Sequence, residues 1–197
     1  MKDKAAFAEV IESSLQGWTA QSWQWDQFPS FGSLVVVHSG PRTIFGIIYE
    51  VETGSSDSTR QPFAYGKTEQ ELRAQQPQIF EFLRTSFGCL TVGYSEQGKI
   101  FYTLAPAPAK IHAFVERPEL EQARRFFSND SYMHLLFNVA AQRCNVDELL
   151  LALVTHRGAI GALSQDTFAR FIRMYITLTS NDYQRVRLFL RRAELVV

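Results

Sequence analysis

The first apolar residues of the chain recur at intervals of three and four positions. This spacing places them on one face of a helix and predicts an amphipathic helix over residues 3–16. Gly17 then stands where the C-terminal cap of a helix is expected. The apolar residues that carry this prediction are Phe7, Val10, Ile11 and Leu15.

A tryptophan-rich tract follows the predicted helix. Trp18, Trp23 and Trp25 lie among glutamines and precede Pro29. Tryptophan buries a large area when a segment docks on a folded body, so we interpret the tract as an arm clamped against the rest of the protein. A segment that lines a groove is the alternative. Residues 1–29 are therefore expected to form an N-terminal helix and a Trp-rich arm.

From residue 31 the pattern changes to apolar runs rich in β-branched residues, which predict short strands. Gly46 interrupts one run and indicates a bend or bulge, as a small closed barrel requires. Residues 68–71 (TEQE) have the spacing of a capping box and predict one inserted helix. We therefore expect residues 30–117 to form a small antiparallel β-barrel of about five to six strands. The predicted strands cover residues 31–38, 43–51, 89–94, 100–104 and 111–115.

After Pro118 the periodicity is helical throughout, so residues 118–197 are expected to form an all-helical domain. Strands that precede helices, rather than alternate with them, predict an α+β fold and argue against a wound parallel sheet. The predicted helices cover residues 119–127, 132–144, 147–157, 167–178 and 181–192.

The composition excludes some classes of protein. With 197 residues, the chain suits one domain or two small ones. Its 20 Lys and Arg residues balance 20 Asp and Glu residues, so no overall field attracts it to nucleic acid or to anionic lipid. Cys89 and Cys144 have no CxxC spacing, and we expect both to be small buried hydrophobes. Without a signal peptide or a long apolar run, the protein is expected to be cytoplasmic, with no membrane partner.

Few residues have the spacing of a known reaction centre. Residues 158–164 (GAIGALS) lack the lysine of a phosphate-binding loop and lie between two predicted helices, so we interpret them as a connector. The histidines form no HxxxH or HExxH pattern, although His38 and His112 lie on predicted strands that could meet. Glu50 and Glu52 share a strand face, and a solvated strand end is the favoured interpretation. No catalytic, cofactor-binding or metal-binding residue is predicted.

Arginine is concentrated in the last two predicted helices. Guanidinium groups suit phosphate and carboxylate recognition, but cations near a helix C-terminus are also favoured by the helix dipole. We favour the dipole interpretation and keep an acidic partner surface and nucleic acid as alternatives. With the tryptophans, these arginines are the candidate partner contacts: Trp18, Trp23, Trp25, Arg170, Arg173, Arg185, Arg187, Arg191 and Arg192.

Several stretches of the predicted barrel carry a resemblance to a known domain. They are residues 31–37 (FGSLVVV), 43–51 (TIFGIIYEV), 76–83 (QPQIFEFL), 92–94 (VGY) and 108–112 (PAKIH). Together they resemble the HAS-barrel family, which is shared by HerA-type translocases and rotary ATP synthase subunits. The family also includes free-standing bacterial proteins without a described function, and this chain resembles those most. The resemblance covers roughly residues 30–117. It implies a barrel that helps an ATPase to assemble into a ring, and it transfers no catalytic residue.

Three functions follow from these observations. The lack of a catalytic pattern favours a non-enzymatic interaction or assembly module, accessory to a larger ATPase-type complex, whose partner is protein, either a second copy or that complex. A nucleic-acid-binding protein that uses the Arg-rich C-terminal helices is the first alternative. The second is an enzyme whose site forms only in three dimensions, near His38, Glu50 and His112. No cofactor is expected.

Overall fold

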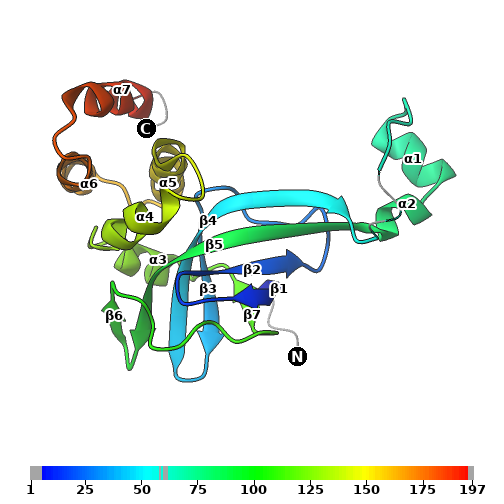
Figure 1. Ribbon diagram of the computed structural model, residues 1–197, viewed down its shortest axis with the longest axis horizontal. Helices are drawn as coiled ribbons and strands as arrows, with labels where there is room; N and C mark the ends of the chain where they lie inside the picture. Colours follow the sequence, from blue (N-terminus) through cyan, green and yellow to red (C-terminus); the bar gives the residue numbers. More distant parts are fainter. Residues whose placement is uncertain (1–5, 58, 60–61, 195–197) are drawn as a thin grey trace.

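Seven antiparallel strands form one sheet in the computed structural model, which describes residues 6–57, 59 and 62–194. The strand order is β2-β1-β7-β3-β4-β5-β6, and a further pairing of β2 with β5 closes six of the strands into a barrel, with β6 outside it (Figure 1). The predicted α+β fold, a barrel followed by helices, is confirmed. The strands are β1 (Ala6–Ser13), β2 (Gly17–Ser22), β3 (Leu34–Ser39), β4 (Arg42–Ser55), β5 (Leu83–Glu96), β6 (Lys99–Phe101) and β7 (Phe114–Glu116).

The predicted N-terminal helix is wrong, because this segment folds as the β1–β2 hairpin of the barrel. Ala8 and Val10 are fully buried at the two-residue spacing of a strand, whereas Ile11 and Leu15 are 47% and 45% exposed. β1 also pairs with β7, and β2 pairs with β5. These long-range backbone hydrogen bonds outweigh the local helical spacing. Residues 3–5 of the predicted helix lie outside the described residues.

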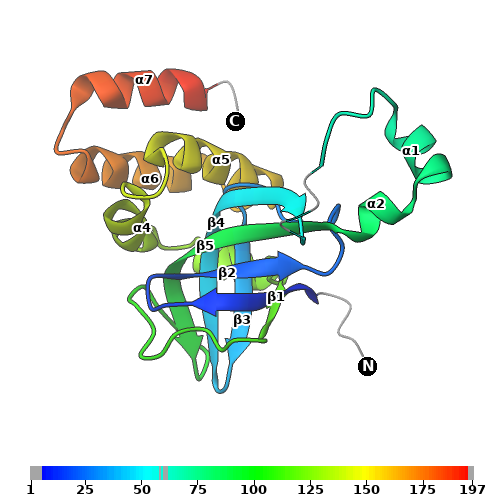
Figure 2. The ribbon, with the colours of Figure 1, turned by 45° about the vertical axis from the view of Figure 1, so that its right-hand side comes forward.

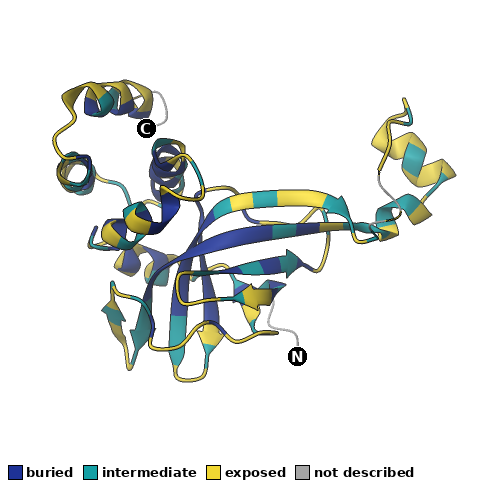
Figure 3. Ribbon diagram, viewed as in Figure 1, coloured by how far each residue is buried: buried dark blue, intermediate teal, exposed yellow. Residues whose placement is uncertain are grey.

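The central parts of β3, β4 and β5, residues 34–37, 44–48 and 87–93, are buried on both faces, which explains their continuous apolar runs (Figure 3). Val35 and Val37 point into the barrel core, whereas Leu34 and Val36 belong to a second core shared with the helices. The bulge predicted at Gly46 is confirmed by a register shift between Phe45 and Gly46. The barrel core contains Ala8, Val10, Trp18, Ala20, Val35, Val37, Ile44, Ile48, Phe87, Cys89, Ala105, Ala109 and Val115.

The C-terminal helices cover one side of the barrel (Figure 2). Gly32 has φ +78°, and a Cβ at this position would lie 2.6 Å from the Cβ of Ala152, so the chain before β3 approaches α5 very closely. Ser164 caps α6 as expected of the connector at residues 158–164. The helices are α3 (Leu120–Phe126), α4 (Tyr132–Ala140), α5 (Val146–Ala159), α6 (Gln165–Leu178) and α7 (Tyr183–Ala193).

Strands β4 and β5 continue past the barrel as a two-stranded ribbon, and two short helices lie at its far end (Figures 1 and 2). These are α1 (Glu69–Gln75) and α2 (Gln78–Glu81). The predicted capping box is confirmed, since Thr68 and Glu71 exchange side-chain and backbone hydrogen bonds at the start of α1. We call the described part of residues 53–85 the arm.

Candidate functional site

The three tryptophans of the N-terminal tract, which were predicted to dock together on the body of the protein, have separate environments. Trp18 is 3% exposed in the barrel core, so its assignment as a partner contact is wrong. Trp23 makes an edge-to-face contact with the ring of Phe114 at 5.2 Å between centroids. Trp25 instead stacks on Phe80 of the arm at 5.9 Å. The tryptophans therefore form no single aromatic surface.

Two of the candidate arginines hold the last helix to the body of the protein. Arg185 forms a forked pair with Asp147, with Nη2–Oδ1 and Nε–Oδ2 distances of 2.8 and 2.9 Å. Arg192 forms a second fork with Glu148, at 2.6 and 2.9 Å, and these hydrogen bonds lower the pKa of the Glu148 carboxyl. Both acids lie in the first turn of α5, so the pairs join α7 to α5. Their assignment as free partner contacts does not fit this geometry.

The other four arginines lie on α6 and α7. Arg170 donates to the Ser128 carbonyl and lies 3.8 Å from Asp130, and Arg173 bonds the carbonyl of Ala169 on its own helix. Arg187 and Arg191 of α7 are exposed. In addition, α7 lies at the opposite end of the molecule from α2, on which Trp25 stacks (Figure 1). Arginine and tryptophan are thus not combined in the surface that the nucleic-acid alternative requires.

The residues suggested for an enzymatic site do not share a hydrogen-bonding partner, and Glu50 is remote from His38. His38 Nδ1 lies 3.0 Å from the Thr43 hydroxyl, whereas His112 lies 2.5 Å from a carboxylate oxygen of Glu9. Thr43 and Glu50 are seven residues apart on β4, which is about 20 Å along a strand. Glu50 and Glu52 are exposed, but they lie within β4, which continues to Ser55, and not at a strand end as expected. Within the described ranges, no group of three or more His, Cys, Asp or Glu side chains is placed to hold a metal ion.

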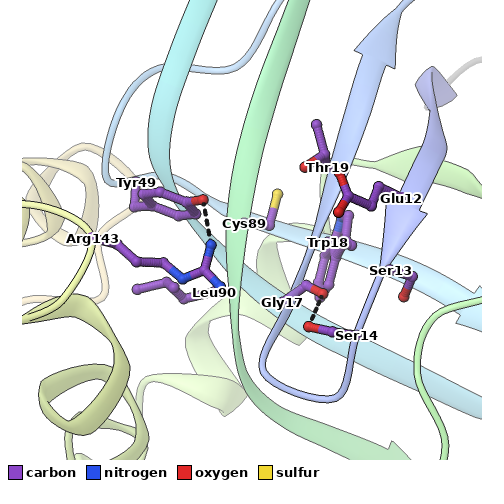
Figure 4. A pocket seen from close by; sticks show the side chains of 10 residues that line it. All are labelled: Glu12, Ser13, Ser14, Gly17, Trp18, Thr19, Tyr49, Cys89, Leu90 and Arg143. Atoms are coloured by element: carbon purple, nitrogen blue, oxygen red, sulfur yellow. Dashed lines mark hydrogen bonds between the residues drawn. The ribbon is translucent and has the colours of Figure 1, made fainter.

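A narrow cleft lies beside β2 and β5, and its lining includes Cys89 and Trp18, with Tyr49 and Arg143 across β5 from Trp18 (Figure 4). Its volume is about 60 Å³, and the Arg143 guanidinium donates to the Tyr49 hydroxyl across 3.2 Å at its edge. Burial raises the pKa of the Cys89 thiol well above its usual value, which keeps it protonated and unreactive. The cleft is therefore too small and too inert for a substrate.

The arm carries a much larger apolar cavity, of about 610 Å³. Phe63 is 69% exposed and its ring lies 4.2 Å from that of Tyr65, centroid to centroid. α1 buries none of its residues, so the arm has little core of its own. Exposed apolar surface of this kind is typical of an interaction site. The apolar side chains that line the cavity are Pro62, Phe63, Tyr65, Leu72, Ile79, Phe80, Phe82 and Leu83.

Contacts from the segment after β2 brace the arm against the barrel. The Arg73 guanidinium lies 4.7 Å from the Phe80 ring centroid and 6.0 Å from that of Trp25, so it covers the stacked pair. Arg73 also lies 3.8 Å from a carboxylate oxygen of Asp26, and the Thr85 hydroxyl donates to the Trp25 carbonyl. The cavity is thus presented at a defined position beyond the barrel.

The sequence contained a weak signal for this surface. Phe63 and Tyr65 stand in a stretch otherwise rich in Ser, Thr, Gly and Pro, where aromatic side chains have no core to enter. Ile79 and Phe80 were assigned to the packing pattern of the family resemblance instead.

Neither a protein-family model nor a curated protein matches the chain. In the part of the chain that the structure describes, no helix has the length and apolar character needed to cross a membrane.

Proposed function

We propose that this protein is a non-enzymatic assembly module that binds another protein through the arm. The observation that carries the proposal is the apolar cavity of about 610 Å³ on a projecting segment, with Phe63 69% exposed beside it. Isolated exposed apolar residues are ordinary, but a contiguous concave group of them is characteristic of a binding surface. In this function the barrel is the rigid base that carries the arm.

The proposed partner is a protein segment that inserts one or two apolar side chains into the cavity. Aromatic anchors in a pre-formed apolar pocket supply most of the affinity at protein interfaces. Trp25, Arg73 and Phe80 hold the arm in place before binding, which reduces the entropy lost on association. The HAS-barrel resemblance suggests that this partner belongs to a larger ATPase-type complex, and a second copy of the chain is the other source of such a segment.

The test uses Phe63→Ser, with Tyr183→Ser as the matched control. Tyr183 is 80% exposed on α7, so both variants remove an exposed aromatic ring with little effect on folding. Light scattering of the purified proteins measures self-association, and quantitative capture from cells that express the chain identifies partners. We expect the complex to be retained by the wild type and Tyr183→Ser, and weakened about tenfold or more by Phe63→Ser, which is typical of a lost aromatic anchor.

Binding of the captured partner, purified and titrated against each variant, decides the proposal. If Phe63→Ser and Tyr183→Ser bind it equally well, the arm is not the interaction surface. A chain that is monomeric and captures no protein above the level of a folded control would also contradict an assembly function.

A further inference from the structure

A second cavity, of about 620 Å³, involves α4 and α6, helices that lie far from the arm (Figure 1). Residues 128–130, α4 and α6 line it. Its volume is in the range of sites for small metabolites. Most of its lining side chains are hydrogen-bond donors: Ser128, Asn129, His134, Arg170, Arg173 and Thr177.

Asp130 is the one buried residue among those that line this cavity, with a side chain 5% exposed. Its Oδ1 accepts a hydrogen bond of 2.8 Å from Arg157, whose side chain is fully buried and also reaches the Tyr132 hydroxyl. The other carboxylate oxygen, Oδ2, accepts no hydrogen bond from the residues that the structure describes, and its ion-pair neighbour is Arg170 Nε at 3.8 Å. A buried carboxylate oxygen without a donor is costly, so a ligand donor at this point would be favourable. Because Oδ2 is closed to solvent, such a donor reaches it only when a neighbouring side chain shifts.

The charge around Asp130 favours an anion. Arg157 is the buried partner of Asp130, whereas Arg170 and Arg173 line the cavity with this single carboxylate, so the charged groups of the lining carry one net positive charge. Arg173 uses its Nε on the Ala169 carbonyl of its own helix, and its two terminal nitrogens have no partner among the described residues. Guanidinium groups bind phosphate through two parallel hydrogen bonds, and an imidazole adds a further donor.

We propose that this cavity binds a small phosphate monoester. Arg173 and His134 hold the phosphate, and the unpaired oxygen of Asp130 accepts a hydrogen bond from a hydroxyl group of the same ligand. The two requirements act together. The arginine supplies affinity for the dianion, and the carboxylate selects an ester that carries a donor close to the phosphate. A sugar phosphate has both groups within the length of one molecule. This site is independent of the arm and of its protein partner.

Isothermal titration of the full chain with ribose 5-phosphate, inorganic phosphate and ribose tests the proposal. We expect ribose 5-phosphate to bind in the submillimolar range and inorganic phosphate about tenfold more weakly. Inorganic phosphate lacks the sugar hydroxyl group that would donate a hydrogen bond to Asp130. Arg173→Gln should weaken binding by about tenfold or more, as the loss of a charge-assisted pair requires. Arg173 is exposed, so this variant should keep the wild-type circular dichroism and melting temperature.

Arg191→Gln is the matched control, because Arg191 is an exposed arginine on α7 and lines none of this cavity. It should bind ribose 5-phosphate as the wild type does. The affinity of His134→Gln should lie between those of Arg173→Gln and Arg191→Gln. Absence of binding up to about 10 mM ligand would overturn the site. Equal losses in Arg173→Gln and Arg191→Gln would show general electrostatic attraction instead. Equal affinity for inorganic phosphate and ribose 5-phosphate would refute the role of Asp130.

Discussion

Adding one methyl group at Gly46 tests how the barrel core is packed. A Cβ at this position would lie 2.3 Å from Cη2 and 2.5 Å from Cζ2 of Trp18, and 3.1 Å from the Cβ of Cys89. Trp18 is 3% exposed and Cys89 is 1% exposed, so neither has open space to move into. Overpacking a core usually costs about 1–3 kcal/mol, and the closeness of these contacts places Gly46→Ala at about 2–3 kcal/mol.

The clash has a specific partner, which a double-mutant cycle can isolate. Trp18→Phe removes the outer ring atoms that Gly46→Ala would strike, and by itself it should cost about 1–2 kcal/mol through the space it leaves. In that background the added methyl fills part of the space, so Gly46→Ala should cost less than about 1 kcal/mol. The expected coupling free energy is therefore about 1–2 kcal/mol, in the direction that favours the double variant.

Urea unfolding followed by far-ultraviolet circular dichroism measures all four proteins without depending on Trp18 fluorescence. Gly54→Ala is the control, since Gly54 lies on the same strand and nothing is within 4 Å of its Cβ position. It should be neutral or slightly stabilising. If Gly46→Ala were as stable as Gly54→Ala, or if the costs of Gly46→Ala and Trp18→Phe simply added, the packing argument would be refuted.

Three further predictions concern an ion pair, an imidazole and the two thiols. Arg157→Met removes the buried partner of the Asp130 carboxylate and leaves only Arg170, at 3.8 Å, as a counter-ion, so it should reduce the free energy of unfolding by about 3–5 kcal/mol in urea titrations. Burial lowers the pKa of His156, so the unfolded chain binds this proton more readily. As the pH falls below 6.5, the ordinary pKa of histidine, the free energy of unfolding should therefore decrease more in the wild type than in His156→Gln. Cys144 should react with an aromatic disulfide reagent in the folded protein, whereas Cys89 should react only as fast as the protein unfolds.

For each of these three predictions, one result would contradict the reasoning. A melting temperature of Arg157→Met equal to that of the wild type would show that the ion pair does not stabilise the helical part. Parallel stability curves of the wild type and His156→Gln between pH 5 and pH 7 would exclude linkage through this imidazole. Rapid labelling of both thiols under native conditions would mean that the barrel opens locally around Cys89.

The central strands could be predicted because they are buried on both faces. Val35, Val36 and Val37 contact either the barrel core or the helices, so the run is apolar at every position and its meaning does not depend on register. The helix caps at Thr68 and Ser164 were equally readable, since a cap is a local hydrogen-bonding pattern. The strands could be predicted because both of their faces meet apolar surroundings. The caps could be predicted because their hydrogen bonds lie within a few residues.

The N-terminal segment could not be read in the same way. Its apolar residues satisfy a helical period, and only pairing with β5 and β7, which lie more than sixty residues further along the chain, selects the strand. The arm and the Asp130 cavity were also hidden. Phe80 and Asp130 acquire a role through neighbours that are distant in sequence, and Phe63 is marked only by the weak signal of an aromatic residue in a polar stretch.

The amino-acid sequence alone determined the class of the fold, the order of a barrel followed by helices, and the positions of turns and caps, because each depends on short-range pattern and chain stiffness. Tertiary structure decided which segments complete the barrel, that Trp18 is core, and that Arg185 and Arg192 join two helices. It also decided where surface is left over for binding. Such surface is what remains after long-range packing has chosen its partners, so it is a property of the folded chain and not of any one segment.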